Sequence, residues 1–312
     1  MSSIDRRVAQ SEQTSERPAA RWQLVTRSLD FALGPCVMGI VNVTPDSFSD
    51  GGNFIATGAA VEHALKLVDE GAGILDIGGE STRPGALPVE SEEELRRVVP
   101  VIEEVCRHTT APISIDTSKA AVAAAALAAG AEIINDVTGL AGDARMLAMA
   151  ASARAGVCAM HMRGTPQTMQ QNPTYSDVVA EIYDYLGARR EVLRQAGIES
   201  SRICLDPGIG FGKTHQHNLD LLACCHRFHA LGCPLLVGPS RKGFIAKVIA
   251  DKAADRGPGT IGVALSLAQQ GVQVLRVHDV RAVHQALLLF QATGGLGGVD
   301  GAASFPDTSR LS

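Results

Sequence analysis

VMGIVNVTPDSFSDGG, residues 37–52, is the stretch that decides the fold. An apolar run rich in Val and Ile ends at Asn42 and is followed by a loop of small and polar residues. Such a run, closed by turn residues, predicts a buried parallel strand. Ligands of α/β proteins bind in the loops after the carboxyl ends of such strands. Asn42 and the loop are therefore candidates for a functional site, although Pro45 could equally place polar residues there for turn geometry alone.

The alternation of an apolar run with a helical segment recurs along the chain. The predicted strands are 37–42, 73–78, 112–116, 132–136, 157–161, 202–206, 234–238 and 272–278. The predicted helices are 57–70, 91–108, 119–129, 143–155, 177–196, 216–230, 241–250, 259–270 and 280–291. Continuously apolar strands alternating with helices indicate a parallel sheet covered on both faces. We predict the α/β class and a single (β/α)8 TIM barrel, with an open doubly wound sheet as the alternative.

Local signals support the helices and define the ends of the domain. Ser91 and Glu94 have the spacing of a capping box. Glycines follow four helical runs where a left-handed cap is favoured, at Gly71, Gly130, Gly197 and Gly232. Residues 1–20 are polar without periodicity and predict a disordered N-terminal tail, 21–292 predict one domain, and 293–312 predict a flexible Gly-rich C-terminal tail.

The composition limits the partners and the compartment. The 312 residues carry 28 Lys and Arg against 33 Asp and Glu, a net charge of −5, without a basic block. We therefore expect neither nucleic-acid nor membrane binding. Seven cysteines, odd in number and without a CxxC pair, indicate reduced thiols. Since no apolar stretch resembles a secretory signal, a cytoplasmic protein is expected.

Polar residues terminate the predicted strands. They are Asn42, Asp76, Asp116, Asn135, Asp136, His161, Asp206, Ser240, Arg276 and His278. Because the carboxyl ends of barrel strands meet at one rim, these side chains are expected to form one site. Each could instead cap the following helix, and for Asp76 and Asp136 the pattern does not decide between the two interpretations.

The residue types at this rim predict the chemistry of the ligand. Asp116, Asn135 and Asp206 suit a flat heterocycle that offers adjacent N–H donors and ring acceptors. Cations in an otherwise acidic chain imply phosphate or pyrophosphate. They are Arg83, Arg241, Lys242 and Arg276, with His278 beside them.

Two other motifs suggest different chemistry. Residues 207–214, PGIGFGKT, are similar to a nucleotide-binding P-loop but have Pro207 where that motif needs Gly. We interpret these glycines as allowing the backbone to approach a flat ring, with Phe211 stacking on it. The His and Cys residues between His215 and His229 have spacings that could bind zinc, but a solvated helix face is the more common explanation.

Eight motifs, in order, resemble those of the dihydropteroate synthase family of pterin-binding enzymes. They are VNVTPDSFSDGG (41–52), DIGGESTRPGA (76–86), ISIDTSK (113–119), INDVTG (134–139), MHMRGTP (160–166), LDPGIGFGK (205–213), SRKGF (240–244) and RVHDV (276–280). The resemblance covers about residues 31–291. It implies a TIM-barrel transferase of folate biosynthesis, which condenses 6-hydroxymethyl-7,8-dihydropterin pyrophosphate with p-aminobenzoate to give 7,8-dihydropteroate and pyrophosphate.

The resemblance also implies the roles of individual residues. The pterin pocket would contain Asp116, Asn135, Met160, Asp206, Phe211, Gly238 and Lys242. The pyrophosphate site would contain Asn42, Arg83, Arg276 and His278, with Mg²⁺ held by Asn42 and phosphate oxygens. The p-aminobenzoate pocket would contain Phe48, Thr82, Arg83, Pro84, Lys242 and Gly243. Catalysis would depend on Asp116, Lys242, Arg276 and His278, with pyrophosphate leaving before the amine attacks a pterin-methylene cation.

The family comparison leaves some properties open. Residues 44–52 and 81–86 match two mobile loops, and family members are usually homodimers. Gly243 replaces a Ser found in many members, so a hydroxyl contact to the aminobenzoate carboxylate is lost and sensitivity to sulfonamides, which compete there in the family, is undecided. Two alternatives are a pterin-binding relative without synthase activity and a methyltetrahydrofolate-dependent methyltransferase, which would not need Arg83, Arg276 and His278 together.

Overall fold

The computed structural model describes residues 18–44 and 53–296, with the side chains of 53–56 excepted. The predicted tails therefore lie largely outside the described residues, as do Phe48 and most of the predicted loop 44–52. No helix in the described part of the chain is long and apolar enough to cross a membrane.

Eight parallel strands form the centre of the molecule and confirm the predicted TIM barrel. They are β3 (Cys36–Asn42), β4 (Ile74–Gly78), β5 (Ile113–Asp116), β6 (Ile133–Asp136), β7 (Gly156–Met160), β8 (Ile203–Asp206), β9 (Leu236–Val237) and β10 (Val274–Val277). Their order in the sheet is β8-β7-β6-β5-β4-β3-β10-β9. A parallel bridge between Leu205 and Leu235 joins the two ends of this order and closes the sheet.

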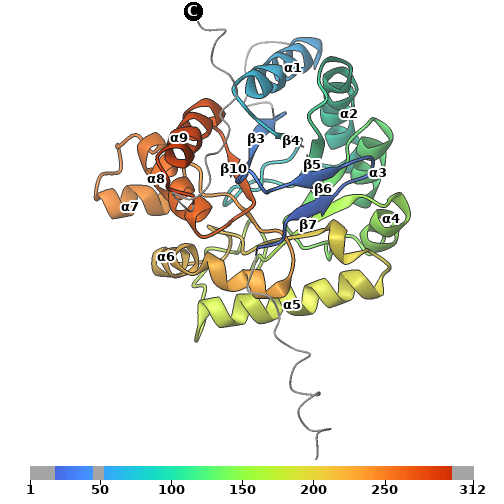
Figure 1. Ribbon diagram of the computed structural model, residues 1–312. Helices are drawn as coiled ribbons and strands as arrows, with labels where there is room; N and C mark the ends of the chain where they lie inside the picture. Colours follow the sequence, from blue (N-terminus) through green and yellow to red (C-terminus); the bar gives the residue numbers. More distant parts are fainter. Residues whose placement is uncertain (1–17, 45–52, 297–312) are drawn as a thin grey trace, which may run out of the picture.

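The helices surround the strands as a ring (Figure 1). They are α1 (Asn53–Asp69), α2 (Ser91–His108), α3 (Ala120–Ala128), α4 (Met146–Ala153), α5 (Val178–Gln195), α6 (His215–Ala223), α7 (Gly243–Ile249), α8 (Gly257–Gln269) and α9 (Val280–Ala292). Each predicted helix is present, but the one predicted over 216–230 ends early and continues as a 3-10 segment, η4 (Cys225–Leu231). The four predicted cap glycines all have positive φ.

Two features differ from the sequence interpretation. An antiparallel hairpin of β1 (Arg21–Gln23) and β2 (Ser28–Asp30) precedes the barrel and was not predicted. Its fully buried Trp22 packs in the inner apolar cluster of the barrel and donates a hydrogen bond to the Arg202 carbonyl at 2.9 Å. The capping box predicted at α2 is wrong, because Glu90 is the N-cap residue and makes no side-chain cap bond.

The strand register places the predicted site residues inside the barrel. Met38, at the level of Ile74, belongs to the inner apolar cluster, whereas its neighbour Val37 belongs to the outer one. Side chains alternate between the faces of a strand, so every second residue from Met38 faces inward. The same alternation on the other strands directs polar residues into the carboxyl end of the barrel. They are Asn42, Asp76, Asp116, Asn135, Asp206, Arg276 and His278.

Candidate active site

Asp76 is the central acceptor of the inner polar residues. Its Oδ2 accepts hydrogen bonds from Arg276 Nε at 2.6 Å and from Asn135 Nδ2 at 3.1 Å. Arg276 also donates from Nη2 to Asp116 Oδ2 at 2.7 Å. Asp76 is fully buried, and its Oδ1 has no hydrogen-bond partner. The sequence left Asp76 undecided between site and helix cap; the structure places it inside the site, between two of the predicted ligand-binding residues.

Burial and the Arg276 guanidinium determine the pKa shifts of the carboxyl groups in the site. Burial raises the pKa of Asp116 to about 7, an effect that Arg276 opposes and the nearby Asp76 strengthens. Although burial works against its charge, Arg276 has its pKa raised by Asp76 and Asp116. Burial also raises the pKa of Asp206, against the backbone hydrogen bond from Gly208. Near pH 7 the Asp116 carboxyl group can therefore either accept a hydrogen bond from a ligand or donate one to it.

A second part of the site is the loop after β8, which contains Phe211. Asp206 Oδ1 accepts a hydrogen bond from Gly208 N at 2.6 Å, and Lys242 donates to the Ile209 carbonyl. The Lys242 ammonium also lies 5.0 Å from the centre of the Phe211 ring. Burial lowers the pKa of Lys242 to about 8, and Asp206 opposes this shift. Asp206, Phe211 and Lys242 are thus brought together, as the sequence predicts.

Buried Lys213 fixes this loop and was missed as a site residue. Its ammonium donates to the Phe211 carbonyl at 2.9 Å, lies 3.0 Å from His161 Nδ1 and 3.4 Å from the His161 carbonyl. A Cβ on Gly208 would lie 1.9 Å from that same carbonyl oxygen, and one on Gly212 would lie 2.6 Å from the Arg163 carbonyl oxygen. These two glycines therefore permit close backbone packing within the protein, a different reason from the approach to a flat ring that the sequence suggested.

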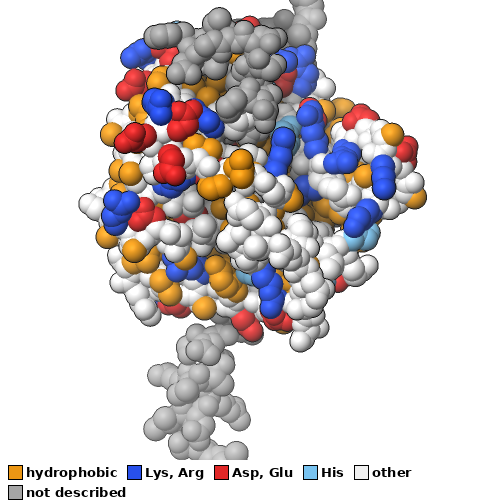
Figure 2. Space-filling model, turned by 180° about the vertical axis from the view of Figure 1, so that it is seen from behind, with side chains coloured by type: hydrophobic (Ala, Val, Ile, Leu, Met, Phe, Trp, Pro, Cys, Tyr) orange, Lys and Arg blue, Asp and Glu red, His pale blue; other side chains and the backbone are white. Residues whose placement is uncertain are grey.

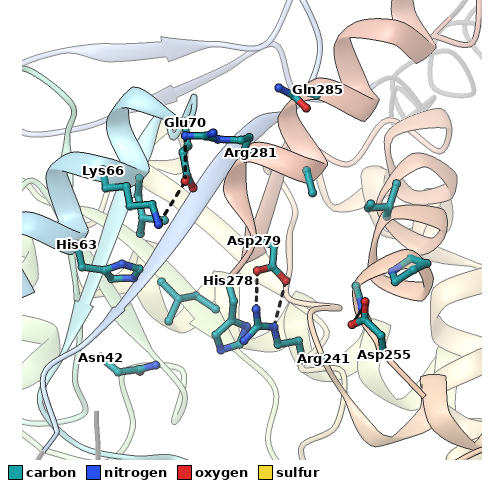
Figure 3. A pocket seen from close by; sticks show the side chains of 16 residues that line it. Asn42, His63, Lys66, Glu70, Arg241, Asp255, His278, Asp279, Arg281 and Gln285 are labelled. Atoms are coloured by element: carbon teal, nitrogen blue, oxygen red, sulfur yellow. Dashed lines mark hydrogen bonds and ion pairs between the residues drawn. The ribbon is translucent and has the colours of Figure 1, made fainter. Parts of the chain in front are cut away.

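His278 lines a groove of about 850 Å³ formed by residues of α1, α8 and α9 (Figure 3). Ser240 Oγ accepts the His278 backbone N–H at 3.2 Å and lies 3.0 Å from His278 Nδ1. When the Ser240 hydroxyl donates its proton to Nδ1, the neutral imidazole carries its own proton on Nε2, where it is available to a ligand. Burial lowers the pKa of His278 to about 4, with Arg276 as the next cause, so a neutral donor is expected near pH 7.

The groove beyond His278 carries paired charges. Arg241 bonds Asp279 through Nε at 3.1 Å, while Lys66 and Arg281 lie 3.8 and 3.5 Å from Glu70. Asn42 also lines the groove, and its side-chain amide makes no hydrogen bond to the side chain or backbone of another described residue. The predicted anion-binding residue Arg241 is therefore already neutralised in the structure, whereas Asn42 and His278 present groups that a ligand could use.

The remaining predicted residues lie on segments around the rim. Thr82 is half-buried, and Arg83 and Pro84 are exposed. Met160 ends β7 and is buried, and Gly238 follows β9 with Lys242 Nζ 3.9 Å from where its Cβ would be. Gly243 is the first residue of α7, and a Cβ there would meet nothing within 4 Å.

Two sequence suggestions can be compared with the side-chain positions. Figure 2 shows a group of Lys and Arg side chains on one part of the face drawn, while others lie beside acidic side chains elsewhere on it. His217 completes a capping box with Thr214 at the start of α6, and His229 contacts the Gln270 carbonyl at 2.8 Å. Among the residues that the structure describes, no three His, Cys, Asp or Glu side chains form a group suited to a metal.

Comparisons with known proteins agree with this geometry. A model of the pterin binding enzyme family matches residues 38–278. Dihydropteroate synthase of Escherichia coli (strain K12) is 46% identical over 266 residues, which is 85% of this chain and 94% of the relative. The enzyme of Neisseria meningitidis serogroup B is 48% identical, over 83% of this chain and 93% of its own.

Solved structures extend the similarity to the fold. Xanthomonas albilineans dihydropteroate synthase with 4-aminobenzoic acid has a TM-score of 0.82 at 46% identity, covering 88% of this chain and 98% of its own. A Yersinia pestis dihydropteroate synthase in a sulfonamide drug complex has a TM-score of 0.82 at 42% identity, with the same coverage. The chain therefore belongs to the pterin-binding enzyme family, among the dihydropteroate synthases.

Proposed function

We propose that this chain condenses 6-hydroxymethyl-7,8-dihydropterin pyrophosphate with p-aminobenzoate, giving 7,8-dihydropteroate and pyrophosphate. The observation that carries the proposal is the buried arrangement of Asp76, Asp116, Asn135 and Arg276 at the carboxyl end of the barrel, joined by bonds of 2.6 to 3.1 Å. It offers carboxylate and amide acceptors for a heterocycle beside a guanidinium suited to phosphate. Solved relatives contain 4-aminobenzoic acid and 7,8-dihydropteroate.

The two halves of the proposed pterin pocket have separate tasks. Asp206 and Asn135 would accept and donate hydrogen bonds at the ring, and Met160 and Phe211 would pack on its faces, with Gly238 leaving room beneath. Asp116, which accepts a hydrogen bond from Arg276, would lie near the reacting methylene in this arrangement. Its carboxylate would stabilise the cation that forms when pyrophosphate leaves, because opposite charges in a partly water-excluded site attract strongly.

The proposed pyrophosphate site consists of Asn42, Arg276 and His278, together with Arg83, whose charge acts on His278. Arg276 would exchange one of its carboxylate bonds for a phosphate oxygen, and the Nε2–H of His278 would donate to another. Mg²⁺ fits this site, because the free amide oxygen of Asn42 is a hard ligand and magnesium takes few protein ligands alongside phosphate oxygens and water. When bound, the ion would neutralise charge that develops on the leaving pyrophosphate.

The proposed p-aminobenzoate site uses Thr82, Arg83 and Pro84 together with Lys242 and the backbone of Gly243. A protonated Lys242 would attract the substrate carboxylate. Phe48 is assigned to this pocket from the family resemblance alone, since it lies outside the described residues.

We also infer the state of the protein in the cell. All seven cysteines are free, which supports a reducing cytoplasm. A homodimer is supported by apolar side chains exposed on the outer helices α7 and α9, with Val248 61%, Leu288 52% and Leu289 68% exposed. Light scattering of the purified protein would test the dimer.

Removing the imidazole of His278 tests the division of the site. We expect His278→Ala to weaken binding of the dihydropterin pyrophosphate but to leave the affinity for the same dihydropterin without phosphates unchanged, as measured by calorimetry. The loss of one hydrogen bond to a charged group corresponds to about 1.5–3 kcal/mol. Equal weakening of both ligands would contradict the assignment of His278 to pyrophosphate.

A further inference from the structure

A cluster of three charged side chains lies next to the segment that carries Thr82 and Arg83. Lys119, the N-cap residue of α3, donates to Glu80 and, at 2.5 Å, to Glu94 Oε2. Glu80 follows β4 by two residues, and Glu94 belongs to the first turn of α2. We name Glu80, Glu94 and Lys119 the ion cluster. It joins three elements that are separate in the sequence, and none of its members is among the residues proposed to touch substrate.

Glu80 ties the two ends of the segment together. While Oε2 bonds Lys119, Oε1 accepts the backbone N–H of Val89 at 3.2 Å, nine residues further along. At the near end, Arg97 of α2 donates to the Gly79 carbonyl at 2.7 Å. Gly79 also packs tightly on α2, since a Cβ there would lie 3.0 Å from Glu94 Cγ. Both ends of residues 80–89 are therefore held against α2 and α3.

The middle of the segment has few other restraints. Residues 83–85 are exposed, and Leu87 is 83% exposed. Two hydrogen bonds join it to the loop after β7. Gly85 N donates to the Pro166 carbonyl at 3.1 Å, and Gln167 Nε2 donates to the Ala86 carbonyl at 2.9 Å. The conformation around Thr82 and Arg83 therefore depends strongly on the anchored end at Glu80.

The burial of Glu94 needs a reason of its own. Its side chain is fully buried, and Oε1 has no hydrogen-bond partner. Desolvation of such a carboxylate is costly, and a buried ion pair is often no more stabilising than well-packed apolar side chains. A charged Glu94 is therefore not explained by a gain in folding stability. It is explained if the carboxylate fixes the orientation of Lys119 and, through Lys119, that of Glu80.

We propose that the ion cluster is a positioning device for the p-aminobenzoate site: Glu94 orients Lys119, Lys119 holds Glu80, and Glu80 fixes the segment that presents Thr82 and Arg83. This inference rests on the proposed function for its substrate. The three side chains are positioning residues, because they act through the segment and make no contact with the proposed ligands.

Glu80→Gln is the most direct test, because the side chain is partly exposed and the change keeps its size. We expect the KM for p-aminobenzoate to rise about tenfold, which corresponds to about 1.4 kcal/mol. The affinity for the dihydropterin without phosphates, measured by calorimetry, should change by less than about twofold, because this ligand does not reach Arg83. Amide hydrogen exchange of residues 81–89 should become about tenfold faster, an effect of loosening that does not depend on turnover.

Glu199→Gln is the matched control, since Glu199 also pairs with a cation, Arg154 at 2.9 Å, but lies before β8 at the opposite end of the barrel. It should leave all three measurements unchanged.

Lys119→Met combined with Glu80→Gln should raise the KM for p-aminobenzoate no more than the stronger single variant, because the two substitutions break the same chain of contacts.

Two results would overturn the inference. One is an unchanged KM and unchanged exchange in Glu80→Gln. The other is an equal loss of affinity for p-aminobenzoate and for the dihydropterin without phosphates, with a lowered unfolding temperature, which would indicate a merely structural role. If the wild-type enzyme forms no product, the proposed function fails, and the exchange of residues 81–89 in the variant still decides whether the ion cluster holds the segment.

Discussion

Asp76 offers the sharpest perturbation of the site, because two substitutions separate its charge from its hydrogen bonds. Oδ2 accepts from both Arg276 and Asn135, and Oδ1 has no partner. In Asp76→Asn, the amide oxygen can occupy the Oδ2 position and the amide nitrogen the Oδ1 position. Both bonds then remain and only the charge is lost. Asp76→Ala removes the acceptor as well.

The magnitudes follow from burial. Removing one partner of a buried ion pair typically costs about 3–5 kcal/mol, and we expect this loss of unfolding free energy for Asp76→Ala. In Asp76→Asn the bond from Arg276 keeps its charged donor and only the bond from Asn135 becomes neutral, a change of about 1 kcal/mol. The affinity for dihydropterin pyrophosphate should follow the same order, because the orientations of Arg276 and Asn135 depend on this acceptor.

Urea unfolding gives the stability of the two variants, and calorimetry gives their ligand affinity. The reasoning is refuted if Asp76→Ala is as stable as the wild type, since Arg276 would then not depend on this partner. It is also refuted if Asp76→Asn is as damaging as Asp76→Ala, since charge rather than the bonded geometry would then be decisive.

Three further predictions concern the substrate pockets. Asp206→Ala should weaken pterin binding by about 1–3 kcal/mol, because ring donors lose a buried acceptor; unchanged affinity in calorimetry would remove Asp206 from the pocket. The pKa of Lys242 is lowered to about 8, so Lys242 loses its proton as the pH rises through this value, and the KM for p-aminobenzoate should increase there. Lys242→Arg should abolish that increase, since arginine stays charged, and a persisting increase would point to another group. Gly243→Ser should be accommodated, because a Cβ there meets nothing within 4 Å; it should lower both the KM for p-aminobenzoate and the inhibition constant of a sulfonamide, whereas two unchanged constants would show that the hydroxyl makes no contact.

The barrel could be predicted from the sequence because its strands are continuously apolar and alternate with helices. The predicted bounds of the elements are close to the observed ones, and the predicted helix 91–108 matches α2 at both ends. The hairpin of β1 and β2 escaped notice because each of its strands has three residues, too few for a periodic pattern. Trp22 stabilises it through contacts with strands distant in the sequence, which local pattern does not reveal.

The site was predicted only in part, for a related reason. Strand ends identified Asp116, Asn135, Asp206 and Arg276, and the register brings them together. The sequence does not reveal which polar group bonds which, so the central place of Asp76 was left undecided. Glu94 was assigned to a helix cap from its spacing, yet it bonds Lys119, because a buried cation is a stronger partner for a carboxylate than a backbone N–H at the helix end.

The most direct test of the central claim is to supply the purified protein with dihydropterin pyrophosphate and Mg²⁺, with and without p-aminobenzoate, and to measure pyrophosphate and dihydropteroate together. We predict that both products appear in equal amounts when p-aminobenzoate is present. Binding of the pterin substrate without dihydropteroate formation would contradict the claim and indicate a pterin-binding protein without synthase activity.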